Sequence, residues 1–203
     1  IRDNTIITNK TKVVAVQTAP SFNDKRVGTI RIHLVEYSSK YEVKITTGGS
    51  TTTCTVNTRA GDTAANDAAT TNNAGNPFLN ADEILQGLKT AIDAITNITA
   101  IVIGTSIEIT STADFTMTAV GGRSGMALTS YQDTVDLVSE LPAESKHNRI
   151  VKVDNTAAAY DTYFTKFVAT DGTSGPGVWE ETIAPNVSPG LTDSTLPHKL
   201  YND

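Results

Sequence analysis

The sequence has few of the residues from which enzymes build a deep core or a reactive site. Of its 203 residues, 38% are apolar and 6% are aromatic, and Cys54 is the single cysteine. One cysteine excludes an intrachain disulfide framework and a multi-cysteine metal site, so we expect Cys54 to be a small buried strand residue. A composition this poor in large apolar side chains predicts a thin, sheet-like core.

Clusters of positive charge and long apolar runs are also missing. The net charge is −6 and the pI is about 5.0, which argues against a surface that grips the phosphates of nucleic acid or of anionic lipid. No apolar run approaches the roughly 18 residues that span a bilayer, so we expect no membrane span. The chain begins IRDNT, without Met, and we interpret it as an internal fragment of a longer protein.

The usual catalytic motifs are absent as well. His33, His147 and His198 are scattered singly, with no HxH or HExxH spacing that would bring two of them to one metal. His198 follows a proline and is expected to tie a turn to the backbone. Ser124 lies in GGRSG, which matches neither a nucleophile elbow nor a P-loop and predicts a hairpin turn. We therefore expect no catalytic residue, no cofactor and no metal ligand.

Alternation of apolar and polar residues dominates the rest of the chain. In VGTIRIHLVEY, Ile30, Ile32 and Leu34 share one side of a predicted strand. The segment YEVKIT repeats the pattern after a polar break, and the two together predict an antiparallel hairpin. Gly104 and the glycines at 121–125 mark turns. Further strands are predicted at TKVVAV, TTCTV, TAIVIG, SIEIT, FTMTAV, RIVKV, YFTKFVA and VWEETI.

One amphipathic helix is predicted over residues 81–95, where the apolar residues fall on one face. Asn80 is placed to cap it, and Glu83 follows three residues later, as in a capping box. Leu79 and Ile84 have the spacing of a hydrophobic staple. The tract before the helix, residues 59–79, is poor in large apolar residues and predicts a long exposed loop.

This order of elements predicts an α+β fold that is predominantly antiparallel β. We expect an α+β module over residues 25–141 and a β-rich layer formed by the two ends of the chain, residues 1–24 and 142–203.

The stretch GTSGPGVWEET contains the only tryptophan and two glutamates. Adjacent strand residues point to opposite faces, so Glu180 and Glu181 cannot both flank one scissile bond unless a bulge intervenes. Trp179 can instead form a cross-strand aromatic pair with Tyr163 or Phe167 of the preceding strand. We interpret the segment as a packing hairpin.

Two other functions stay open. A carbohydrate-binding or depolymerase-type receptor-binding module would use Trp179, Tyr163, Glu180 and Glu181 as its groove, and would need an exposed indole and facing carboxyl groups. A repetitive surface adhesin would fit the Thr- and Asn-rich composition, but the sequence has no internal repeat of fixed period.

Four segments of the chain resemble a known family. They are RDNTIITNKTKVVAV, LPAESKHNRIVKV, YDTYFTKFVATDGTSGPGVWEET and STLPHKL, in this order. They are similar to the tail nozzle protein (tail tubular protein B) of short-tailed bacteriophages, the podoviruses. Asn148 stands where that family commonly has a glycine. The matching motif includes the following residues, to which we assign structural roles: Leu141, Pro142, Tyr163, Trp179, Glu181, Thr182, Pro197 and His198.

The resemblance implies a structural protein of the virion tail that is not an enzyme. It implies a homo-oligomer, a hexameric ring, next to the tail adaptor (gatekeeper) ring and the tail fibres. Such a ring would continue the conduit for double-stranded DNA, hold the genome in, and release it at infection. Because DNA slides past a wall that does not bind phosphate, we expect residues that line a channel to be neutral or acidic.

Overall fold

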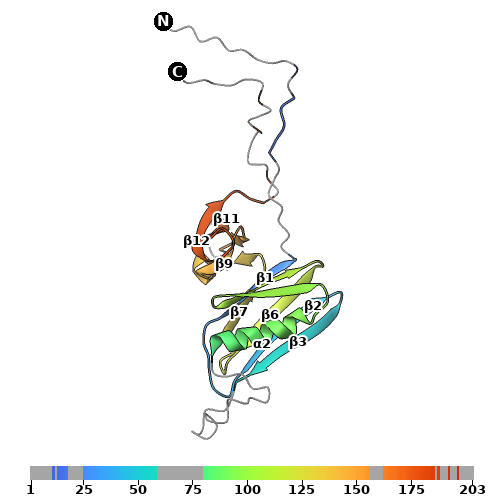
Figure 1. Ribbon diagram of the computed structural model, residues 1–203, viewed down its shortest axis with the longest axis vertical. Helices are drawn as coiled ribbons and strands as arrows, with labels where there is room; N and C mark the ends of the chain where they lie inside the picture. Colours follow the sequence, from blue (N-terminus) through green and yellow to red (C-terminus); the bar gives the residue numbers. More distant parts are fainter. Residues whose placement is uncertain are drawn as a thin grey trace. The chain divides into compact units, whose positions relative to one another are not determined.

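The structure is a computed structural model, and it describes residues 11, 13–17, 25–58, 80–155, 162–185, 187, 192 and 196. The chain divides into two compact units, one of residues 23–182 and one of residues 1–22 and 183–203. The named strands and helices all lie in the first unit (Figure 1). The predicted loop at 59–79 lies outside the described residues. The predicted division into a 25–141 module and a layer from the two ends stays a prediction.

In the smaller unit, the strand predicted at TKVVAV is wrong for the part that is described. Residues 13–15 and 17 lie outside regular strands, and Val16 makes only an isolated bridge. Val13 is 84% exposed. Alternation gives a segment the capacity to pair, but a strand also needs a neighbouring backbone to complete a hydrogen-bonded ladder.

The described part of residues 27–131, which we call the helix subdomain, contains two antiparallel sheets and one α-helix (Figure 1). The first sheet has four strands in the order β4-β5-β1-β7, and the second has three in the order β3-β2-β6. Their bounds are β1 Val27–Ile32, β2 Lys40–Thr47, β3 Ser50–Asn57, β4 Ile98–Ile103, β5 Ser106–Ser111, β6 Phe115–Gly121 and β7 Leu128–Tyr131.

The helix α2, Ala81–Asp93, confirms the predicted amphipathic helix and its N-cap. The Oδ1 atom of Asn80 accepts a hydrogen bond of 2.9 Å from the backbone N–H of Asp82, which satisfies one of the free donors of the first turn. The helix is two residues shorter than predicted, and the Oδ1 atom of Asp93, its last residue, accepts from the N–H of Ala100 at 2.7 Å. Leu79, the other half of the predicted staple, lies outside the described residues.

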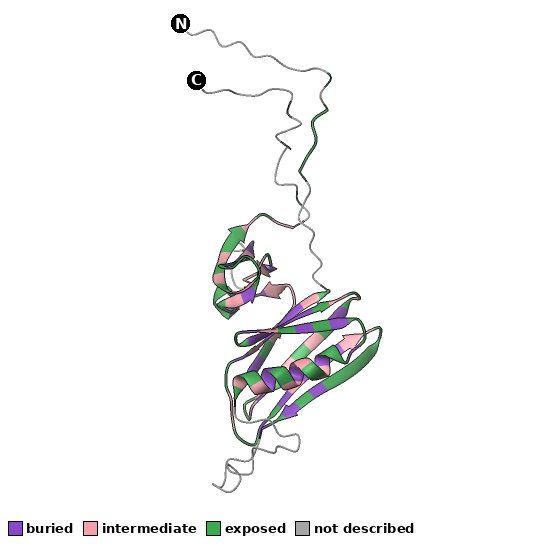
Figure 2. Cartoon of the chain, viewed as in Figure 1, coloured by how far each residue is buried: buried purple, intermediate pink, exposed green. Residues whose placement is uncertain are grey.

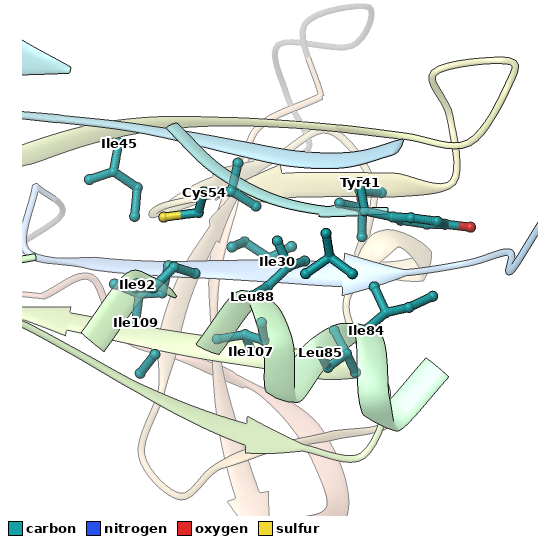
Figure 3. Close-up of a cluster of buried hydrophobic side chains, with 14 of the residues drawn as sticks. Ile30, Tyr41, Ile45, Cys54, Ile84, Leu85, Leu88, Ile92, Ile107 and Ile109 are labelled. Atoms are coloured by element: carbon teal, nitrogen blue, oxygen red, sulfur yellow. The ribbon is translucent and has the colours of Figure 1, made fainter. Parts of the chain in front are cut away.

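The core of the helix subdomain lies between α2 and the strands (Figure 3). Along the strands and the helix, buried and exposed residues alternate as their periods require (Figure 2). Cys54 is buried in this core, as predicted, and burial raises the pKa of its thiol. The largest fully buried side chains are Tyr41, Phe167, Ile30, Ile45, Ile84, Leu85, Leu88, Ile92, Ile107, Ile109, Leu128 and Val43; of these, Phe167 lies in the five-stranded sheet.

The five-stranded sheet has the order β8-β10-β11-β12-β9, and its pairings are antiparallel except for β8 with β10. A short 3-10 helix, η2 (Val138–Glu140), follows β8. The strands are β8 Thr134–Val135, β9 Glu144–Lys146, β10 Ile150–Val153, β11 Tyr163–Ala169 and β12 Ser174–Thr182. Together with the helix subdomain, this confirms an α+β fold that is predominantly antiparallel β.

The hairpin predicted from VGTIRIHLVEY and YEVKIT is wrong. The strand β1 pairs with β5 and β7, whereas β2 pairs with β3 and β6, so the two consecutive strands belong to different sheets. Leu34, predicted to face inward, lies beyond the end of β1 and is 51% exposed. The hydroxyl of Tyr41 donates to the carbonyl of Leu34 at 2.9 Å, and this bond fixes the crossing between the sheets.

The turn predicted around Ser124 is present but does not close a hairpin within one sheet. It connects β6 of the three-stranded sheet to β7 of the four-stranded sheet. The hydroxyl of Ser124 accepts from the N–H of Met126 at 3.3 Å, which is a turn-stabilising contact.

Candidate functional site

The hairpin of β11 and β12 contains the predicted aromatic pair. Phe167 lies directly opposite Trp179 in the strand register. Their ring centroids are 5.1 Å apart at an interplanar angle of 61°, an edge-to-face arrangement, which aromatic pairs prefer. Phe167, rather than Tyr163, is the partner. The indole is therefore a packing group of the sheet.

The Leu141–Pro142 element packs against this hairpin. The Trp179 indole Nε1–H donates to the carbonyl of Pro142 at 2.8 Å. Leu141 is buried in a small apolar cluster with Val135, Val151 and Val153, against which Tyr163 and Trp179 also pack. The fold thus brings together Leu141, Pro142, Tyr163 and Trp179, which lie far apart in the sequence.

The turn between β11 and β12 is held by Asp171. Its carboxylate accepts from the backbone N–H groups of Thr173 at 2.7 Å and Ser174 at 3.0 Å, and from the Thr173 hydroxyl at 2.6 Å. These bonds, the Thr173 hydroxyl first, hold the pKa of Asp171 below its usual value. Nearby, Asn148 has a φ of 63°, in the left-handed region that glycine and asparagine tolerate best. A glycine at this position, as the resemblance implies for the family, would take the same conformation without strain.

An open groove of about 540 Å³ lies at one end of the five-stranded sheet. Tyr163 and Glu181 line it together with Asp136, while Trp179 and Glu180 do not. The adjacent glutamates of β12 therefore do not converge on one cleft, as parity predicted. The full set of lining residues is Asp136, Leu137, Val138, Ser139, Val153, Asn155, Thr162, Tyr163 and Glu181.

The described histidines make separate structural contacts. His33 Nε2 lies 2.7 Å from the Thr129 hydroxyl, and burial and then the charge of Arg31 lower its pKa. His147 Nδ1 accepts from the N–H of Ala169 at 3.2 Å. Within the described residues, no group of three His, Cys, Asp or Glu side chains has the geometry of a metal site. Pro197 and His198 lie outside the described residues.

A buried polar network, which the sequence did not indicate, joins β5 to β9 and to the residue just before β10. Glu108 is 3% exposed and Arg149 is 8% exposed. The Glu108 carboxylate accepts from the hydroxyls of Ser145 at 2.8 Å and Thr29 at 3.2 Å. Arg149 Nε lies 3.6 Å from Glu108 Oε2, too long for a hydrogen bond, so this contact is Coulombic.

Two further contacts fix the guanidinium of Arg149, to the carbonyls of Ile150 and Gln132. Tyr131 lies at the same place, with a buried hydroxyl that has no hydrogen-bond partner among the described residues. Burial, and after it the negative charge of Glu108, raise the pKa of Tyr131 well above its usual value. The Thr29 side chain acts in the opposite direction and lowers that pKa.

Comparison with protein families matches residues 1–203, the whole chain, to the bacteriophage nozzle protein family. The chain belongs to this family. It is therefore a nozzle protein, a structural component of the phage virion tail. No curated protein matches the sequence.

Membership of the nozzle family gives the hairpin and the Leu141–Pro142 element their context. Both carry residues by which the sequence resembles tail nozzle proteins, and both are held by packing and backbone contacts. The structural roles assigned to Glu181 and Thr182 stay predictions. No helix in the described part of this nozzle protein has the length and apolarity to cross a membrane.

Proposed function

We propose that this nozzle protein forms part of a ring-shaped conduit, a homo-hexamer, that retains the phage genome and then releases it. In this proposal the ring contacts the tail adaptor (gatekeeper) protein and the tail fibres, and double-stranded DNA passes through without specific binding. The family match over residues 1–203 carries the proposal. The chain would act as a wall and would catalyse no reaction.

The pairing of charges supports passage of DNA without binding. At least six of the eleven Lys and Arg side chains of the described residues lie within 4 Å of a carboxylate, which reduces the positive charge available for phosphate. Glu42 lies between two lysines on β2 and pairs with both, and hydrogen bonds from Lys40 and then Lys44 lower its pKa. The other pairs are Arg26–Asp114, Lys89–Asp93, Arg149–Glu108 and Lys152–Asp154.

Electron microscopy of the full-length assembled protein tests the ring. We expect a closed ring with an axial channel whose lining is neutral or acidic. A monomer at every concentration, or a continuous inward-facing ring of Arg and Lys, would contradict the proposal.

A DNA-retention assay tests the charge argument. The wild-type chain is expected to bind duplex DNA weakly, with little salt dependence. Glu42→Gln frees Lys40 and Lys44, so its binding should strengthen and the slope of log K against log salt should steepen by up to about 2. Thr53→Gln, a neutral change on the neighbouring strand, is the control. Equal affinity of Glu42→Gln and Thr53→Gln for duplex DNA would mean that charge pairing does not weaken DNA binding.

A carbohydrate-binding role is the second candidate, because the groove combines Tyr163 with the carboxylates of Asp136 and Glu181. An aromatic ring beside polar groups is a common way to hold a ligand in a pocket. Calorimetric titration of oligosaccharides into wild type and Tyr163→Ala tests this role. Heat that is lost in Tyr163→Ala and kept in Val178→Ala would favour it, and no heat with wild type would remove it.

A further inference from the structure

The helix subdomain and the five-stranded sheet bury separate apolar clusters. The first cluster fills the space between α2 and its two sheets. The second contains Val135, Leu141, Val151 and Val153 and belongs to the five-stranded sheet. Tyr131, at the C-terminal end of the helix subdomain, packs against this second cluster. Each part therefore has its own hydrophobic source of stability.

Charged side chains make several of the hydrogen bonds and ion pairs that cross the boundary. Glu108 of β5 binds Ser145 of β9 and pairs with Arg149. Arg31 of β1 donates to the carbonyls of Glu140 at 3.0 Å and Leu141 at 3.5 Å. The boundary therefore combines the apolar contact of Tyr131 with directional contacts that lose their strength when the groups move apart by a few ångströms.

A buried ion pair differs from an apolar interface in how it fails. Removing charges from water is unfavourable, and the attraction between them restores this loss only while the geometry is kept. Loss of one partner leaves an uncompensated buried charge, which is strongly destabilising. Water that enters an opened boundary can solvate Glu108 and Arg149 at once, whereas it cannot solvate the two apolar clusters.

We propose that the Glu108–Arg149 network is an ionic joint at which the five-stranded sheet separates from the helix subdomain while both parts keep their own folds. Opening exposes Glu108, Ser145 and Arg149 together, and leaves the core around Cys54 closed. This joint does not depend on the ring, so it stands or falls separately from the proposed conduit.

Two thiols can report separately on opening of the joint and on opening of the helix subdomain. Cys54, the only natural cysteine, is 2% exposed in the core of the helix subdomain. Ser145→Cys places a second thiol at the joint, where the native side chain is fully buried. Labelling of the 203-residue chain by a thiol reagent in native buffer then measures joint opening at position 145 and subdomain opening at Cys54. We expect position 145 to label at least about tenfold faster than Cys54, with a smaller dependence on urea.

Breaking the Glu108–Arg149 ion pair should raise the labelling rate at position 145 and not at Cys54. In the Ser145→Cys chain, Glu108→Gln is expected to raise labelling at position 145 on the order of 100-fold and to leave Cys54 within about twofold. Asp154→Asn, which breaks the partly exposed Lys152–Asp154 pair, is the matched control and should change both rates less than about fivefold.

Three outcomes would overturn the joint. They are equal labelling rates and urea dependences of the two thiols, a parallel rise of both rates in Glu108→Gln, and an effect of Glu108→Gln no larger than that of Asp154→Asn. The first comparison needs only Ser145→Cys, so equal rates in that chain would overturn the joint even if Glu108→Gln does not fold.

Discussion

Replacing Trp179 should destabilise the five-stranded sheet through packing. The indole is half-buried and contacts Phe167 edge to face. Full burial of a Trp makes its truncation to Ala cost about 3–5 kcal/mol, so half burial gives about 2 kcal/mol. Losing the hydrogen bond to the buried Pro142 carbonyl adds about 1 kcal/mol. Trp179→Ala should therefore lower the free energy of unfolding by about 3 kcal/mol.

Urea unfolding followed by far-UV circular dichroism measures this loss without the tryptophan signal. With an m-value of about 2 kcal/mol/M, the midpoint should fall by about 1.5 M in Trp179→Ala. Trp179→Phe keeps an aromatic ring and loses the hydrogen bond, so its midpoint should fall by about 0.5 M.

Val178→Ala is the matched control, because Val178 is the adjacent residue on the opposite face and is 56% exposed. Its free energy of unfolding should change by less than about 0.5 kcal/mol. If Trp179→Ala matched this control in stability but lost binding of an oligosaccharide, the packing interpretation would be refuted and the indole would be a ligand-binding group.

Three further predictions concern the helix subdomain. Gly104→Ala should lower the free energy of unfolding, measured with urea, by about 1–3 kcal/mol, which is more than Gly48→Ala should lower it. Both glycines have a positive φ, but a Cβ at position 104 would also lie 2.5 Å from Glu144. Equal losses in the two variants would contradict this close approach. Cys54 should react with a thiol reagent no faster than its subdomain opens, since burial raises its pKa; fast labelling in native buffer would contradict this. The hydrogen bond from Lys89 lowers the pKa of Asp93. Its contribution to the free energy of unfolding is therefore present above the pKa that Asp93 has in the unfolded chain, and is lost as pH falls through the folded pKa. Asp93→Asn should make the free energy of unfolding fall less steeply at acid pH, and an unchanged fall would contradict the prediction.

Features determined by short stretches of sequence were predictable. The Asn80 cap, the apolar face of the helix and the turn at Gly104 each depend on residues a few positions apart. The Phe167–Trp179 pair could also be anticipated, because a short turn brings its two strands together.

Strand partners were not predictable in the same way. The parity of Ile30 indicates which face it buries but not which strand lies beside it, and Ile30 pairs with Ile107 and Ser130. These partners lie far along the chain, so the choice depends on the packing of the whole subdomain and on few local signals. For that reason, the expectation that β1 pairs with the next strand in the sequence, β2, was wrong.

The buried joint could not be predicted because its strands have two covered faces. In SIEIT, Ile107 and Ile109 enter the core, so parity assigns Glu108 to solvent. The five-stranded sheet covers that face, and Glu108 is buried with Ser145 and Arg149. When a polar residue lies on the side of a strand that alternation assigns to solvent, the local sequence does not indicate that another sheet will cover it.

The joint bears on how the proposed conduit could change shape. A wall that widens for DNA must either melt part of its fold or move folded parts against each other, and hinge or shear motion of packed parts is the usual solution. Melting the helix subdomain would expose the core around Leu88 and Cys54, whereas opening at Glu108 and Arg149 would expose groups that water solvates well. Because water solvates the groups that the second route exposes, we expect a conduit built from this chain to move at the joint first. Labelling at position 145 that precedes labelling at Cys54 during opening would support this order, and the reverse order would contradict it.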